Sequence, residues 1–521
     1  MAHTDKVIVT NVGAMKVKYG SGYSQITKAV RRLVAADKKR GLKTRLVALD
    51  NSRSMKLLKA KPVLDARDCR QNKTAIDGVF AALTPDYLVL LGAVDVIPHQ
   101  DLVNPVPFDP EGDADRTAWS DLPYACEAPY SIKVADFRGP TRVVGRIPDL
   151  TGGTDPAYLV RLLDTAATYQ TRSRSEYESY LGLTASVWKG STALSLLNTF
   201  GNSTDLKLAP PDGPNWPAAA VGRRSHFINC HGGAIDPFYY GQKGNHYPVS
   251  HAAEYVDGKI SEGTVAAAEC CYGAELYDPS LLDSRQAGIC NTYLKNKAYG
   301  FFGSTTIAYG PSEGNGEADL LCQYFMQSVL AGASLGRAAL EARQRFVRSD
   351  VILEPTSLKT LAQFNLMGDP AVHPVSAPTH ALNQTKGYQA ALKKGLGGQP
   401  AARTARRELL IRAGQMLRQT VGAVQRAIKV AIPAAVKKAF EQIAKESQMG
   451  ALTLGAFTVP SAGGPLPKGA KGFRALAPKK REVYVAVGKR KETPDKVTQV
   501  VVLSALVEQG KVVRLRRLHS R

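Results

Sequence analysis

The feature that most constrains the fold is an uninterrupted apolar run, Tyr87-Leu88-Val89-Leu90-Leu91-Gly92. A strand without polar residues has to be buried on both faces, as in a parallel sheet that helices cover. Apolar runs at Lys6–Val12 and Thr44–Leu49 alternate with the helical spacing of Ser24–Lys39 and Ile76–Leu83. This alternation predicts an α/β fold with a mostly parallel sheet and helices on both sides.

The same pattern begins again after residue 180. We expect further strands and helices there, and Ser334 is a suitable N-cap for the last helix. The expected strands are Ser225–Asn229, Thr264–Cys270 and Tyr299–Ile307, and the expected helices are Glu317–Leu330 and Ser334–Arg348. The sequence therefore predicts two α/β subdomains, 1–175 and 176–375.

Charge separates the rest of the chain from these subdomains. Residues 376–521 hold 28 Lys and Arg against 7 Asp and Glu, in a chain whose formal net charge is +23. This region divides by composition into a basic amphipathic helical segment (376–449), a Gly/Pro-rich linker (450–481) and a small basic β domain (482–521). Pro433 should kink or split the helix predicted over 403–449. Such a region attracts an anionic partner (a membrane surface, nucleic acid or an acidic protein), and it fits a solvated extension or a helix packed on its own body equally well.

Cysteine usage and the start of the chain bear on the compartment. The seven cysteines are an odd number and too sparse for a disulfide scaffold. The stretch Met1–Val7 lacks the basic and apolar regions of a secretory signal, and no apolar run reaches the roughly 18 residues of a spanning helix. We therefore expect a cytoplasmic protein.

Two strand ends carry reactive side chains. The first is His226-Phe227-Ile228-Asn229-Cys230-His231-Gly232-Gly233, and the second is Val265-Ala266-Ala267-Ala268-Glu269-Cys270-Cys271-Tyr272-Gly273-Ala274. Functional residues collect at the carboxyl ends of parallel strands, and an imidazole beside a thiol makes the thiol a better nucleophile. The backbone N–H groups of Gly232 and Cys271 could form an oxyanion hole. Either feature alone is more often structural, and their pairing favours nucleophilic catalysis.

In this order, the two blocks resemble the caspase-like (clan CD) cysteine peptidases, and most closely the gingipain family. The stretches Tyr87–Pro98, Val144–Pro148, Gly300–Ser304 and Phe364–Pro370 are similar to further blocks of that family, so the resemblance covers about residues 85–375. It implies a caspase-like three-layer α-β-α sandwich and peptide hydrolysis through a thioester intermediate. It requires no metal and no cofactor.

The identity of the nucleophile differs between related families. Glu269-Cys270-Cys271 resembles the block of metacaspases, whose second Cys attacks, whereas the Gly spacing of gingipains would select Cys270. Side chains alternate along a strand, so only one of the two can face His231, and we favour Cys271 with Cys270 as the alternate. The metacaspase resemblance also implies that Glu269 binds the Arg or Lys of a substrate, and a structural ion pair is the competing interpretation.

The sequence thus predicts a cysteine endopeptidase that acts on a protein or peptide substrate. A His231–Cys271 dyad would cleave after Arg or Lys, and the enzyme would also cut its own chain near 468–481. The alternative is an inactive peptidase-like scaffold whose basic C-terminal region binds an anionic partner. The stretch Gly310-Pro311-Ser312-Glu313-Gly314 matches the G-x-S-x-G motif of serine hydrolases. This hypothesis is weaker than that of a cysteine peptidase, because Pro311 restricts the strained turn that the serine nucleophile needs.

Overall fold

The computed structural model describes residues 4–350, 352–376, 399–427, 431–459, 481–490, 497 and 499–521. Apart from Arg481, the predicted self-processing segment 468–481 lies outside the described residues. Within the described ranges, every helix is too short or too polar to cross a lipid bilayer.

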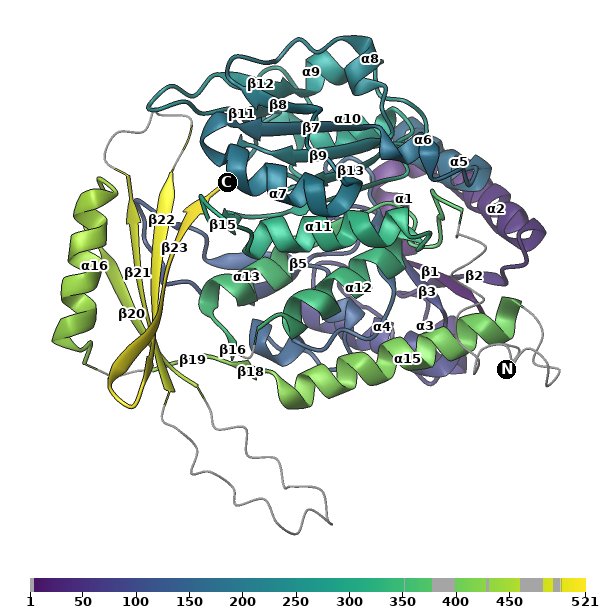
Figure 1. Cartoon of the computed structure of the whole chain (residues 1–521). Coiled ribbons are helices and arrows are strands. Elements are labelled where there is room, and N and C mark those ends of the chain that lie inside the picture. Colours follow the sequence, from purple (N-terminus) through teal and green to yellow (C-terminus); the bar gives the residue numbers. More distant parts are fainter. Residues whose placement is uncertain are drawn as a thin grey trace, which may run out of the picture.

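Ten strands of the described residues form one central sheet (Figure 1). Their order across the sheet is β2 (Thr44–Ala48), β1 (Lys6–Thr10), β3 (Tyr87–Leu91), β6 (Val144–Ile147), β17 (Phe364–Met367), β14 (Gly300–Ser304), β13 (Val265–Ala268), β9 (Ser225–Asn229), β7 (Tyr180–Ala185) and β8 (Leu206–Ala209). Neighbouring strands are parallel except β14 and β17, which are antiparallel. Two parallel sets of opposite direction therefore share one sheet, which confirms the predicted α/β fold.

Helices cover both faces of this sheet. Ala266 and Ala268 of β13 belong to one buried cluster and Val265 and Ala267 to another, so the two clusters lie on opposite faces. The first cluster includes α5 (Ala157–Thr168) and α10 (Ile289–Lys295), and the second includes α7 (Lys189–Phe200), α11 (Glu317–Leu330) and α12 (Leu335–Arg348). Figure 1 shows α11 and α12 in front of the sheet, so the three layers of an α-β-α sandwich are present.

The helix ends follow local signals in the sequence. The Ser334 side chain accepts a hydrogen bond from the Arg337 backbone N–H, which confirms the predicted N-cap of α12. The remaining helices of the first 376 residues are α1 (Val12–Tyr19), α2 (Tyr23–Lys39), α3 (Ser52–Leu57), α4 (Cys69–Leu83), α6 (Ser175–Glu178), α8 (Ala218–Val221), α9 (Ala253–Val256) and α13 (Pro355–Gln363). Short strands near the site are β4 (Gln100–Val103), β5 (Thr117–Ser120), β10 (His231–Gly232), β11 (Phe238–Tyr240) and β12 (Val249–Ala252).

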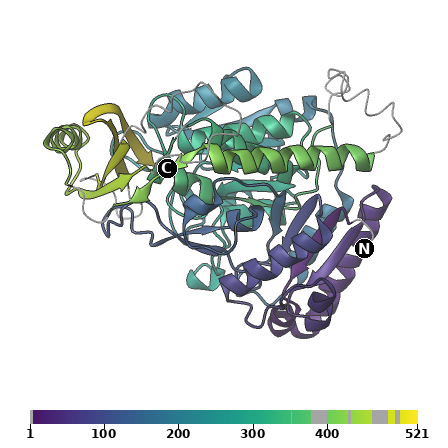
Figure 2. The same ribbon diagram turned by 90° about the horizontal axis from the view of Figure 1, so that it is seen from below.

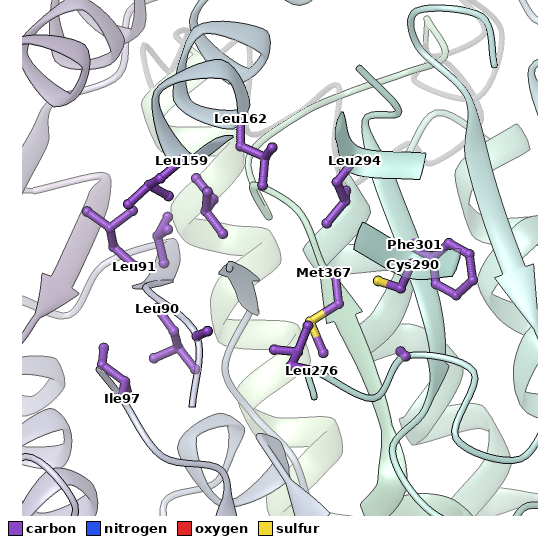
Figure 3. Close-up of a cluster of buried hydrophobic side chains, with 14 of the residues drawn as sticks. Leu90, Leu91, Ile97, Leu159, Leu162, Leu276, Cys290, Leu294, Phe301 and Met367 are labelled. Atoms are coloured by element: carbon purple, nitrogen blue, oxygen red, sulfur yellow. The ribbon is translucent and has the colours of Figure 1, made fainter. Parts of the chain in front are cut away.

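The junction between the two parallel sets is filled by apolar side chains (Figure 3). Leu90 of β3 and Leu159 of α5 belong to the same buried cluster as Phe301 of β14 and Met367 of β17. All four are buried. The two halves of the chain are therefore joined by a shared core as well as by backbone hydrogen bonds.

A second sheet stands beside the sandwich (Figure 1). In the described residues its order is β15 (Tyr309–Gly310), β23 (Lys511–Ser520), β22 (Val500–Glu508), β21 (Arg481–Lys489), β20 (Thr453–Thr458) and β19 (Gln425–Arg426). We call strands β19 to β23 the tail sheet, and α16 (Ala434–Glu446) packs on it through Val436 and Phe440. The strand β20 lies within 450–481, where the composition predicted only a linker. The pairing with β21 outweighs the local Gly/Pro signal there.

The helix α15 (Gln399–Thr420) connects the tail sheet with the N-terminal strands (Figure 2). The prediction that this helix continues to Pro433 is wrong, because Gly422–Ala423 (β18) pairs instead with Ile352–Leu353 (β16). Arg407 of α15 forms an ion pair with Asp86 at 3.1 Å, and Arg403 lies 3.4 Å from Asp5. Part of its basic charge is therefore directed at the body of the protein.

Candidate functional site

The strands β9 and β13 bring the two reactive blocks to one edge of the sheet. They are parallel neighbours, with Ile228 opposite Ala268, and the Glu269 N–H donates to the Ile228 carbonyl at 2.8 Å. Their carboxyl ends therefore lie side by side. His231 leaves one strand at this edge, and the Cys270–Cys271 pair leaves the other.

The two cysteines point in opposite directions. Cys270 packs in the cluster that contains Cys230, and Cys271 packs in the cluster on the other face. Cys271 lines a cavity of about 520 Å³ together with Gly232, Gly233 and other residues, whereas Cys270 does not line it. Cys271 is thus the member of the pair that borders an open space.

The Cys271 thiol is held by the backbone of Ala308. Sγ accepts from the Ala308 N–H at 3.3 Å and donates toward the Ala308 carbonyl at 3.6 Å. Burial raises the pKa of Cys271 to about 12, so the group is a neutral thiol in this arrangement.

His231 is a buried, neutral imidazole with a defined tautomer. The Gln242 amide donates to the Gly244 carbonyl and to the Tyr247 hydroxyl, which turns its Oε1 toward His231. Nε2 of His231 lies 2.8 Å from this Oε1 and therefore carries the proton. Nδ1 is left with a free lone pair and has no hydrogen-bond partner in the described part of the chain. Burial lowers the pKa of His231 to about 3.

Arg521, the last residue of the sequence, occupies this site. Its main-chain oxygen accepts from the Cys271 N–H at 3.0 Å and from the Gly232 N–H at 3.4 Å. Its own N–H donates to the Ala308 carbonyl at 3.0 Å. Two backbone N–H groups converge on one carbonyl-type oxygen, which is the geometry of an oxyanion hole.

Gly232 makes this close approach possible. A Cβ atom at position 232 would lie 2.0 Å from the main-chain oxygen of Cys271, which no side chain tolerates. The glycine that follows His231 is therefore required by packing between the two strand ends.

The side chain of Arg521 fills a pocket formed by Asp319, Pro311, Trp188 and Gly310, which we call the arginine pocket. Nη2 lies 2.9 and 3.1 Å from the two carboxylate oxygens of Asp319 and 2.8 Å from the Pro311 carbonyl. The guanidinium carbon lies 4.4 Å from the centre of the Trp188 ring. A Cβ at Gly310 would lie 2.1 Å from Nη2, so glycine at this position leaves room for the guanidinium.

Glu269 lies behind this pocket. Its carboxyl is fully buried, and no N–H or O–H group of the described residues donates to it. Burial and the neighbouring Asp319 carboxylate raise the pKa of Glu269 well above its usual value. Glu269 is therefore protonated and can donate to Asp319, as a carboxyl–carboxylate pair. The resemblance implied a direct contact between Glu269 and a bound cation, whereas here Asp319 makes that contact with Arg521.

Sequence reasoning missed Asp319, Trp188 and Gly310. Asp319 belongs to the first turn of α11, far from both reactive blocks in sequence. An acidic first turn is also common at helix N-termini for reasons of the helix dipole, so nothing in the sequence marked this carboxylate as part of a pocket.

Comparison with known proteins gives likenesses among solved structures alone. No protein-family model and no curated protein matches the chain. A solved structure described as "Structure of Protease" aligns over 100% of this chain and 98% of that chain, with 11% sequence identity and a TM-score of 0.48. The function is therefore inferred from the geometry of the site itself.

Proposed function

We propose that this protein is a cysteine endopeptidase that cleaves after arginine. The observation that carries the proposal is the position of Arg521. Its main-chain oxygen lies between the N–H groups of Gly232 and Cys271, and its guanidinium lies on Asp319. A substrate arginine bound in the same way would present its carbonyl carbon to the Cys271 thiol.

The reaction then follows from the groups that surround this carbon. The Cys271 sulfur attacks the carbonyl carbon, and the oxygen that becomes negative is stabilised by the Gly232 and Cys271 N–H groups. His231 takes up the thiol proton and delivers it to the leaving amine, and the C–N bond breaks to give a thioester. His231 then removes a proton from water, which attacks the thioester and releases the acid product and the free thiol.

The arginine pocket explains why the enzyme would prefer arginine at the position before the cleaved bond. The Asp319 carboxylate and the Pro311 carbonyl accept from the guanidinium, and the Trp188 ring packs against its face. A planar guanidinium uses all three contacts, whereas a lysine ammonium has neither the planar face nor the same reach. The predicted preference for Arg or Lys becomes a preference for Arg over Lys.

The main chain of a substrate has a strand to bind. Ser520 and His519 pair antiparallel with Tyr309 and Gly310 of β15, and the Arg521 N–H bonds to Ala308. We infer that the residues before the cleaved bond add to β15 as an extended strand. Such main-chain pairing is independent of sequence, so specificity would come mainly from the arginine pocket.

The test is hydrolysis of fluorogenic peptides that differ only at P1 (Arg, Lys, Asp or Ala). We expect the Arg peptide to be cleaved fastest, and Cys271→Ala and His231→Ala to lose at least a thousandfold in kcat. Cys270→Ala is the matched control and should retain activity. If Cys270→Ala is the inactive variant, the nucleophile is the alternate cysteine. If no peptide is cleaved by any variant, the alternative of an inactive scaffold replaces this proposal.

A further inference from the structure

We propose that the tail sheet is an intramolecular inhibitor of this site, with Arg521 bound in the place of a substrate arginine. The inference rests on the proposed function, since it assigns the role of an inhibitor to the group that occupies the arginine pocket. In this proposal, the arginine pocket and the strand β15 are the docking site for a segment of the same chain.

Ion pairs hold β23 and Arg521 against the part of the chain that forms the site. Three arginines of the segment 514–521 each meet a carboxylate that is itself buried. Arg514 lies 2.6 Å from Glu354, Arg516 lies 2.5 Å from Glu317, and Arg521 lies 2.9 Å from Asp319. The side chains of the three acids are at most 1% exposed. Each of these buried carboxylates needs a cation to compensate its burial, and this one segment supplies all three. The contact is therefore a specific docking of the segment on this surface.

The tail sheet also contacts the residues that orient His231. The Gln499 side-chain amide donates to Gln242 Oε1 at 3.2 Å, and Tyr247 donates to Gln499 Oε1 at 2.9 Å. Gln242 is the hydrogen-bond partner of His231 and Tyr247 packs beside its ring. Gln499, which precedes β22, therefore holds the two neighbours of His231, while Arg521, which follows β23, fills the arginine pocket.

The occupied state leaves one side of the site open. His231 and Arg521 are 1% exposed and Cys271 is 3% exposed. The cavity of about 520 Å³ remains open beside Cys271, and Ile235 and Phe238 are among the residues that line it. The tail thus occupies the half of the site that would bind the acyl part of a substrate. Because the inhibitor is tethered, its effective concentration is on the order of millimolar or higher.

The experiment compares Arg521→Ala with the wild type and with Arg517→Ala, an arginine of the same strand whose side chain contacts Ser447 on the tail itself. Two quantities are measured: the rate at which iodoacetamide alkylates Cys271, followed by peptide mass spectrometry, and KM and kcat for an Arg peptide. We expect Arg521→Ala to raise the alkylation rate at least tenfold and to lower KM at least tenfold with little change in kcat. Arg517→Ala should behave like the wild type.

The two readouts separate this inference from the proposed function. Faster alkylation of Cys271 without hydrolysis of any peptide would leave the tail as the cover of the site and remove the peptidase proposal. Equal alkylation rates and equal KM values in all three proteins would overturn the inhibitor. If Arg521→Ala does not fold, the double variant Arg514→Gln/Arg516→Gln replaces it, because it removes two ion pairs outside the arginine pocket. This variant should also show faster alkylation of Cys271 and a lower KM. If it shows neither change, the inference is overturned.

Discussion

The guanidinium of Arg521 lies on the carboxylate of Asp319, with Nη2 2.9 and 3.1 Å from the two oxygens. Glu269 lies behind Asp319 and is protonated, since burial and that carboxylate raise its pKa. The arginine pocket therefore combines one negative charge with one neutral acid. This division of roles distinguishes the two carboxyl groups in experiments.

The first prediction concerns these two acids. In the Arg521→Ala background, where the tail does not compete, Asp319→Asn should lower kcat/KM for an Arg peptide by at least thirtyfold. Loss of one partner of a buried ion pair costs about 2–5 kcal/mol, and an Ala peptide gains nothing from the charge. Glu269→Gln keeps the shape and hydrogen-bond donor of the protonated acid, so it should change kcat/KM less than fivefold. Equal losses in both variants would refute the assignment.

The second prediction concerns the close approach of the strand ends. Gly232→Ala should lower kcat at least a hundredfold, because the new Cβ displaces the Gly232 N–H, and one oxyanion donor is worth about that factor. Gly233→Ala is the control, since its Cβ would meet the Asp236 side chain at 3.0 Å or more and no backbone atom of the neighbouring strand end. Steady-state kinetics with an Arg peptide measures both. A Gly232→Ala enzyme with normal kcat would show that this N–H takes no part.

The third prediction concerns Gly310, which leaves room for the guanidinium in the arginine pocket. Gly310→Ala places a Cβ where the guanidinium lies, so the variant should lose the Arg peptide while it retains its slow cleavage of an Ala peptide. The same clash should expel Arg521 and accelerate the alkylation of Cys271 in the otherwise unchanged chain. Unaltered cleavage after Arg in this variant would mean that substrate arginines bind elsewhere.

The layers of the fold could be predicted from the sequence because buried parallel strands and amphipathic helices leave strong local patterns. Tyr87–Leu91 became β3, and α11 covers the same residues as its predicted helix. The strand β20 and the short pairing of β16 with β18 could not be predicted, because distant partners determine them. Local sequence carries no signal for such pairing.

The candidate site divides in the same way. His231 and the Cys270–Cys271 pair stand directly after apolar strands, so their positions indicated a site, and the resemblance to metacaspases favoured Cys271 over Cys270. Asp319, Gly310 and Arg521 come from a helix start, a two-residue strand and the last residue of the sequence. Only the tertiary structure brings these three together, and the basic composition of the tail had suggested a separate anionic partner instead. That partner stays a prediction, as does self-processing near 468–481.

The fourth prediction is a loss of stability in mild acid. Burial lowers the pKa of five histidines from 6.5 to about 3 or 4: His226, His231, His251, His373 and His519. Below pH 6.5 these side chains bind protons in the unfolded chain but not in the folded chain, so their contribution to the free energy of unfolding falls from pH 6.5 toward pH 4, while the raised pKa values of Glu269 and Glu275 act in the opposite direction. Each histidine contributes at most about 1.4 kcal/mol per pH unit.

Urea unfolding at pH 7 and pH 5 measures this loss. His373→Gln removes one of the five groups without touching the site, so its loss between the two pH values should be smaller than that of the wild type. A loss between pH 7 and pH 5 that is as large in His373→Gln as in the wild type would contradict the burial of a neutral imidazole at this position.

The most direct test of the central claim is covalent trapping of the nucleophile. An arginyl chloromethyl ketone peptide is incubated with the Arg521→Ala protein, and the modified residue is identified by peptide mass spectrometry. The account predicts a single adduct on Cys271, formed much faster than with the matching aspartyl reagent and prevented by an excess of an arginine-containing peptide. An adduct on Cys270, or the same slow labelling by both reagents, would contradict it.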